Sequence, residues 1–151
     1  MTPILSTILL THVVFGILAV AGMYSLWMML LKREPNSANL KRFSLWSLVF
    51  ILISWISGAY YYLTYYGAAV KPVIKGGAYP WAHLVVMEAK EHIFLFLPFL
   101  LAVVLVAVIF SGTKLGQDEK LKSALTFLVA VMTIIGIAIT LSGLVISGAV
   151  R

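Results

Sequence analysis

The sequence contains no cysteine and little charge, and these two absences exclude several kinds of protein. Without cysteine the chain forms no disulfide, no thiolate metal site and no covalently attached c-type haem. Only 11% of its 151 residues are charged, whereas 62% are apolar. So few charges cannot cover the surface of an ordinary water-soluble domain. Internal repeats and phosphate-binding glycine loops are also missing, and the composition therefore indicates a protein embedded in lipid.

The apolar residues are gathered in four long blocks without Asp, Glu, Lys or Arg. These blocks are residues 2–31, 43–70, 93–113 and 123–150. Each is as long as the roughly 20 residues that a helix needs to cross about 30 Å of hydrocarbon. Helices are expected because they satisfy their backbone polar groups internally, whereas a membrane barrel would need short alternating strands.

We therefore expect an all-α fold, an up-down bundle of four transmembrane helices in a single integral membrane domain, 1–151. The expected helices cover about residues 3–31, 40–66, 81–111 and 121–150. Residues 71–80 contain two prolines and two glycines, and they are expected to form a loop between the second and third helices.

The basic residues predict how the bundle is oriented. Seven of the eleven lie in the first and third connections: Lys32, Arg33, Lys41, Arg42, Lys114, Lys120 and Lys122. Connections rich in lysine and arginine stay on the cytoplasmic side. Both termini and the second connection are therefore expected outside, and the expected location is the cytoplasmic membrane of a prokaryote. Because these residues account for much of the net charge of +6, we expect no nucleic-acid partner.

Ionisable residues inside a span are costly, so they tend to be paired or functional. At about 1.5 Å per residue, His12 and His92 both stand roughly 27–29 Å above the basic ends of their helices. Tyr61 falls at the same level, and Gly16, one turn from His12 on the same face, would leave clearance for a flat macrocycle. Two histidines at equal depth on diagonal helices suit bis-histidine ligation of a b-type haem.

A metal ion is the second interpretation of this region. At about 100° per residue, Glu88, Glu91 and His92 share one helix face, whereas His83 and Lys90 point to the opposite side. Glu88 and His92, four residues apart, are spaced to chelate one ion or to orient one imidazole through the carboxylate. The sequence thus offers a candidate site for copper, zinc or iron. Its expected ligands are His12, Glu88, Glu91 and His92.

Two short motifs resemble a known family. Leu-Thr-His-Val-Val-Phe at 10–15, followed by Ala-Gly at 21–22, and Trp-Ala-His at 81–83 are similar to the first and third helices of membrane-bound bacterial protoporphyrinogen oxidases. More loosely, the chain resembles copper-resistance D-type membrane proteins and compact four-helix b-type cytochromes. The resemblance implies His12 and His83 as haem ligands. It does not extend to the family's activity, because the expected arginine after the first-helix glycine is absent and Val85 replaces the expected lysine.

The leading functional expectation is a small b-type haem-binding membrane protein or respiratory-complex subunit that passes electrons in the outer half of the bilayer. His12 and His92 would be the axial ligands, Glu88 or Glu91 would orient His92 or relay protons, and a quinone or a partner would exchange electrons.

Three rival hypotheses remain open. The first is a cofactor-free accessory subunit of a larger membrane complex, the second a copper, zinc or iron site in metal handling, and the third an enzyme acting on a lipid-soluble substrate. The accessory subunit would pack a stripe of small residues against its complex: Gly136, Thr140, Gly143 and Ser147. The lipid bilayer is a partner under every hypothesis, and homo-oligomerisation is left open.

Overall fold

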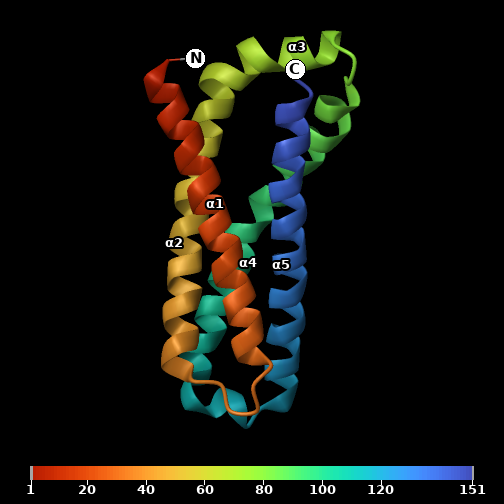
Figure 1. Ribbon diagram of the computed structural model, residues 1–151. Coiled ribbons are helices and arrows are strands. Elements are labelled where there is room, and N and C mark those ends of the chain that lie inside the picture. The colour runs from red at the N-terminus through yellow and green to blue at the C-terminus, as the bar shows by residue number, and fades with distance from the viewer. Residues whose placement is uncertain (1, 151) are drawn as a thin grey trace.

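The structure is a computed structural model that describes residues 2–150, and this part of the chain is helical apart from short connections. Four long helices run side by side (Figure 1). They are α1 (Pro3–Leu30), α2 (Ser37–Tyr61), α4 (Glu88–Ser111) and α5 (Glu119–Gly148). The expectation of an all-α bundle with four long apolar helices is confirmed.

The second and third long helices are extended by segments of different pitch. The π-helix η1 (Tyr62–Val70) and the short helix α3 (Lys71–Gly76) continue α2 without a break. The π-helix η2 (Ala82–Met87) leads into α4, and the 3₁₀ turn η3 (Gly112–Gly116) follows it. The expected loop over 71–80 is therefore wrong in its first part. Pro72 lies in the first turn of α3, directly after the point where the π pitch of η1 ends.

Short polar side chains define where three of the long helices begin. Thr2 accepts a hydrogen bond from the Leu5 amide, Asn36 from the Asn39 amide and Asp118 from the Leu121 amide. Each bond satisfies one of the amides that have no partner at a helix start. Such caps allow the chain to turn sharply in the short connections between apolar helices.

The helices form a square in which α1 and α4 are diagonal. Helix α1 packs against α2 and α5, and α4 packs against the same two neighbours. Both termini lie at one end of the bundle, here called the terminal end, and α3 crosses over this end (Figure 1). The α1–α2 connection and η3 lie at the opposite end, here called the basic end.

Four continuous helical stretches are long and apolar enough to cross a membrane: Pro3–Leu30, Ser37–Gly76, Ala82–Gly116 and Glu119–Gly148. Their outer surfaces carry large apolar side chains, among them Leu63 at 79% exposure and Phe110 at 85%. Contiguous exposed apolar surface of this kind indicates contact with lipid or protein. The fold and its surface are those of a helical membrane protein.

Helices α1 and α2 approach each other closely through small residues. A side chain at Gly22 would overlap Ser47, and one at Gly16 would lie 3.1 Å from the Ser54 hydroxyl. Helices in lipid are held together by such close packing, because lipid tails are as apolar as leucine. In the half of the bundle toward the basic end, the interior is otherwise filled by apolar side chains such as Leu101, Val104 and Met132.

The two glycines of the small-residue stripe on α5 face the other helices of this chain, whereas Thr140 and Ser147 are exposed. A Cβ on Gly136 would meet Val20 and Met23 of α1, and a Cβ on Gly143 would lie 3.6 Å from the Lys90 ammonium of α4. The expected use of these two glycines against a larger complex is therefore corrected. They allow α1 and α4 to approach α5 within the bundle.

Candidate functional site

Two π-helical segments meet beneath α3 at the terminal end. In a π-helix each amide bonds to the carbonyl five residues earlier, a rare geometry that is frequent at functional sites. The segments η1 and η2 both contact α3, and η2 also contacts α5. Between them lies a small buried cluster of Tyr66, Ile74, Ala82 and Ile146. His83 adjoins this cluster and is itself buried, with 1% of its surface exposed.

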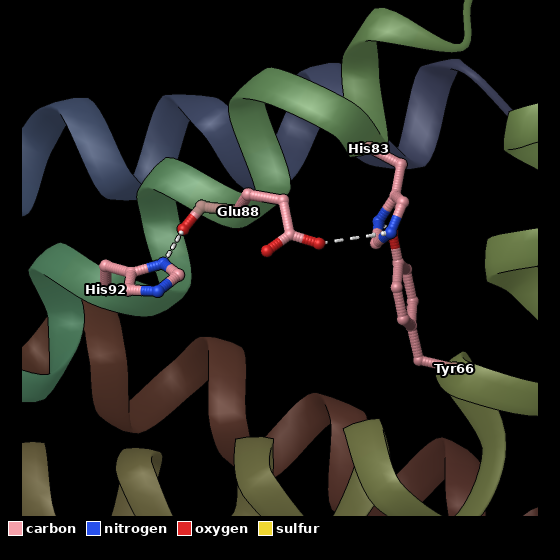
Figure 2. Close-up of polar contacts among 4 residues, drawn as sticks. All are labelled: Tyr66, His83, Glu88 and His92. Carbon is pink, nitrogen blue, oxygen red and sulfur yellow. Dashed lines mark hydrogen bonds and ion pairs between the residues drawn. The ribbon is translucent and has the colours of Figure 1, made fainter.

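His83 is held from both sides of its ring. Its Nδ1 lies 3.1 Å from the Tyr66 hydroxyl, and its Nε2 lies 3.5 Å from Glu88 Oε1 (Figure 2). If the Tyr66 hydroxyl donates to Nδ1, the ring carries its proton on Nε2 and donates it toward the Glu88 carboxylate. Both contacts are satisfied by a neutral imidazole that carries its proton on Nε2. Tyr66, His83 and Glu88 are called the Tyr–His–Glu chain below.

The contact between His83 and Glu88 overturns the expectation that they point to opposite sides of the third helix. At α-helical pitch, residues five apart are separated by about 140° around the axis. Bonding between residues five apart in η2 (Ala82–Met87) instead brings His83 and Glu88 onto the same side. The local change of pitch therefore creates the contact.

The Tyr–His–Glu chain is buried at Tyr66 and partly exposed at Glu88. Tyr66 is 4% exposed, and its ring stacks on Tyr62 with centroids 5.2 Å apart and planes at 21°. The side chain of Glu88 is 42% exposed, against 1% for His83. A molecule outside the bundle can therefore reach the carboxylate of Glu88, whereas the imidazole behind it is enclosed.

Two further ionisable residues, Glu91 and Lys90, lie near the Tyr–His–Glu chain. The Tyr62 hydroxyl lies close to the Glu91 carboxyl group, whose Oε1 is buried and has no hydrogen-bond partner among the described residues. Lys90 points to a different side of α4, toward Gly143 of α5. Within residues 2–150, its ammonium makes no ion pair within 4.0 Å. The terminal end therefore holds three ionisable side chains of α4, of which Lys90 points to a different side from the two glutamates.

His12 belongs to the contact between α1 and α2. Its Nδ1 lies 2.8 Å from the Ser54 carbonyl oxygen and 3.1 Å from the Ser54 hydroxyl, which itself donates to the His12 carbonyl. Gly58 leaves the space for this ring, because a Cβ there would lie 2.5 Å from His12 Nδ1. On α4 the ring that faces His12 is Phe94, with centroids 6.2 Å apart.

His92 lies on the surface of α4 and does not face His12. Its Nδ1 bonds the backbone carbonyl of Glu88 at 2.7 Å, and the ring is exposed (Figure 2). The expected contact with the Glu88 carboxylate is therefore wrong, since that carboxylate is directed to His83. Phe94, which does face His12, is two residues further and so about 200° around the helix from His92. The diagonal placement of α1 and α4 is correct, but the rotation of α4 separates the two histidines.

The structure does not bring the expected haem and metal ligands together among the described residues. His12 packs against α2 and faces Phe94, His92 is exposed, and both ring nitrogens of His83 contact other side chains. The clearance expected at Gly16 is occupied by Ser54 of α2. Across residues 2–150, no group of three or more His, Asp or Glu side chains could hold a metal ion. Glu88 and Glu91 thus have other neighbours than the expected ligand set.

Tyr61 was expected at the level of a cofactor. Its ring is tilted against that of Tyr65, with centroids 5.6 Å apart, and it packs against the buried cluster under α3. Tyr66, the direct partner of His83, was not among the residues expected from the sequence. A signal existed in the tyrosine run at 60–66, but only the π pitch of η1 selects which of these rings points inward. Ser54 and Gly58 were missed as well, because no ionisable group marks them.

No known protein family, no curated protein and no solved structure matches this chain significantly. The function must therefore be inferred from the geometry of the site itself.

Proposed function

We propose that this protein is a small membrane subunit in which Glu88, backed by His83 and Tyr66, exchanges protons with a lipid-soluble partner of the quinol class. The observation that carries the proposal is the buried imidazole that links Tyr66 and a half-exposed carboxylate inside a membrane-length helix. Ionisable residues in such helices are rare unless they serve a function, and they usually have a defined partner.

Each residue of the Tyr–His–Glu chain has a distinct role in this proposal. Glu88 is the base, because its carboxylate is the exposed group and can meet a hydroxyl that arrives through the lipid. His83 donates its Nε2 proton toward this carboxylate and so holds it in one orientation. Tyr66 fixes the tautomer of His83 through Nδ1. The same logic operates wherever a catalytic base is oriented by a third group behind it.

A quinol fits this site because its oxidation releases two protons together with two electrons. The protons would pass one at a time to Glu88 and from there to water at the membrane surface. The electrons would pass to a redox partner in a larger membrane complex. In quinone reduction the same carboxyl group would supply the protons.

The basic residues support an outer location for this site. Seven lysines and arginines lie at the basic end, in its connections and in the first turns of α2 and α5, opposite the Tyr–His–Glu chain. The positive-inside rule favours an orientation in which both termini and the site lie outside the cytoplasmic membrane of a prokaryote. Protons taken from a quinol would be released there.

The proposal can be tested by voltammetry of a short-chain benzoquinone in a lipid film that contains the purified protein. The separation between the reduction and oxidation peaks widens when proton transfer to the quinone is slow. We expect the wild-type protein to narrow this separation relative to the lipid alone. Glu88→Gln should remove the effect, since a positioned base accelerates proton transfer by about 10²-fold or more. His83→Phe should remove most of it.

His92→Phe is the matched control, because His92 is exposed on the same helix and bonds only a backbone carbonyl. It should keep the wild-type peak separation. Equal peak separations in lipid, wild type and all three variants would refute the proposal. The same sample gives a redox difference spectrum, and a b-type band there would favour the haem-binding hypothesis, with His12 as the first ligand to substitute.

A further inference from the structure

A groove open to the surrounding lipid lies between α1 and α5 at the basic end. Its volume is about 500 Å³. One wall is the end of α1, with Trp27, Leu30 and Leu31, and the other is the beginning of α5, as far as Ala130. The lining of α5 from residue 119 to residue 130 corresponds to roughly 16 Å along the helix. The groove therefore extends from the membrane surface into the depth of the acyl chains.

The polarity of the groove changes along its length. Its inner part is lined by Trp27, Phe127 and Ala130, and Phe127 is 73% exposed to the lipid side. Its mouth is lined by the charged and polar side chains of the first turns of α5, including Glu119 and Lys122. An elongated apolar slot with a charged mouth has the shape and polarity of a site for a single phospholipid.

The charge at the mouth is predominantly positive. Lys122 donates a hydrogen bond from Nζ to the Arg33 carbonyl oxygen at 3.2 Å, which holds its ammonium at the groove. Three basic side chains at or near Arg33 and Lys122 in the sequence are exposed: Lys32, Arg33 and Lys120. The connections at this end and the adjoining first turns of α2 and α5 contain seven basic and only three acidic residues, and one of the acids, Asp118, is used as the cap of α5. A neutral headgroup would leave this excess uncompensated.

We propose that this groove binds one anionic phospholipid, with an acyl chain against Trp27, Phe127 and Ala130 and with the phosphate at Lys122. Basic side chains near a membrane surface each contribute about fivefold to the binding of an anionic lipid. Glu119 at the mouth opposes the anion and lowers the affinity. The site lies at the opposite end from the Tyr–His–Glu chain and does not depend on the function proposed for it.

Native mass spectrometry of the purified protein in micelles that contain phosphatidylglycerol or phosphatidylcholine tests the proposal. With the same acyl chains, one phosphatidylglycerol should bind at least fivefold more tightly than phosphatidylcholine. Lys122→Ala should reduce this preference about fivefold, and Glu119→Gln should increase it. Ala130→Phe should weaken the binding of both lipids, because the new ring fills the slot.

Lys114→Ala is the matched control, since Lys114 is an exposed lysine of η3 at the same end that does not line the groove. It should leave the preference within twofold of the wild type. Equal losses in the Lys114 and Lys122 variants would overturn the proposal in favour of diffuse attraction by a basic surface. Equal binding of the two lipids, or binding of free glycerol phosphate as tight as that of the lipid, would overturn it as well.

Discussion

The two ends of the bundle follow different rules of construction. Toward the basic end, the long helices keep regular α pitch and pack apolar side chains such as Leu101 and Met132 against one another. At the terminal end, two helices change to π pitch, two tyrosines stack, and His83 is buried with polar partners. A polar group inside a low-dielectric region is stable only when its hydrogen bonds are satisfied. The irregular backbone therefore accompanies the polar residues, whereas the apolar half needs no such adjustment.

This difference separates the apolar packing from the ionisable groups within one small protein. The apolar half supplies the close packing that holds the helices together, and the terminal end carries groups that cost stability unless they are paired. The same kind of substitution should therefore change the stability of the protein by different amounts at the two ends.

The largest effect is expected from a charge in the apolar half. Val104 is completely buried in α4, and Val104→Asp should cost at least about 2.5–3.5 kcal/mol, the range for a charge at the centre of a membrane helix. The fraction of folded protein recovered by size-exclusion chromatography in detergent measures the loss. Ala89→Asp adds the same charge at an exposed position beside Glu88 and should be recovered almost normally. Equal losses of folded protein in the two variants would show that both ends tolerate an added charge equally.

A smaller but clear effect is expected where His12 packs on α2. Gly58→Ala places a methyl group against the imidazole, which must move away from the Ser54 carbonyl oxygen. Overpacking of this kind costs about 1–3 kcal/mol and should lower the thermal unfolding midpoint in detergent. Gly76→Ala is the control, because no atom outside its own helix and chain neighbours lies within 4 Å of a Cβ there. An unchanged midpoint for both variants would contradict the observed packing of His12.

The two histidines of the third span should differ in their contribution to stability. His83→Phe leaves the Tyr66 hydroxyl without its partner in a buried site, which costs about 1–3 kcal/mol. His92→Phe removes one bond to the backbone carbonyl of its own helix on an exposed face and should change stability by less than about 0.5 kcal/mol. The thermal unfolding midpoints of the two variants measure this difference. If His92, and not His83, were the buried residue, His92→Phe would lower the midpoint more.

The smallest effect is expected at the start of α5, where the structure is regular. Asp118→Ala removes the acceptor for the Leu121 amide and should cost about 1 kcal/mol, as for other helix caps. Glu119→Ala, one residue further and without a cap bond, should cost less. Hydrogen exchange of the first amides of α5 measures both, and equal protection in the two variants would exclude a role for the cap.

Much of the fold could be predicted from the sequence, but the site could be predicted only in part. The uncharged blocks located four long helices, and the basic connections marked one end of the bundle. His83 and Glu88 were both candidates from the sequence, but a helical wheel put them on opposite faces, and the four-residue spacing connected Glu88 to His92. A helical wheel assumes one pitch throughout, and the π-helical turn of η2 violates that assumption.

The sequence by itself determined the class of protein, because long apolar runs without charges have few stable forms other than membrane helices. It also determined the end that carries the positive charge. Only the tertiary structure decided which ionisable groups meet. The rotation of α4 turns Phe94 toward His12 and leaves His92 outside, and the pitch of η2 directs His83 to Glu88. Small changes in helix rotation move side chains across a whole face, and they depend on packing against neighbouring helices that no local pattern encodes.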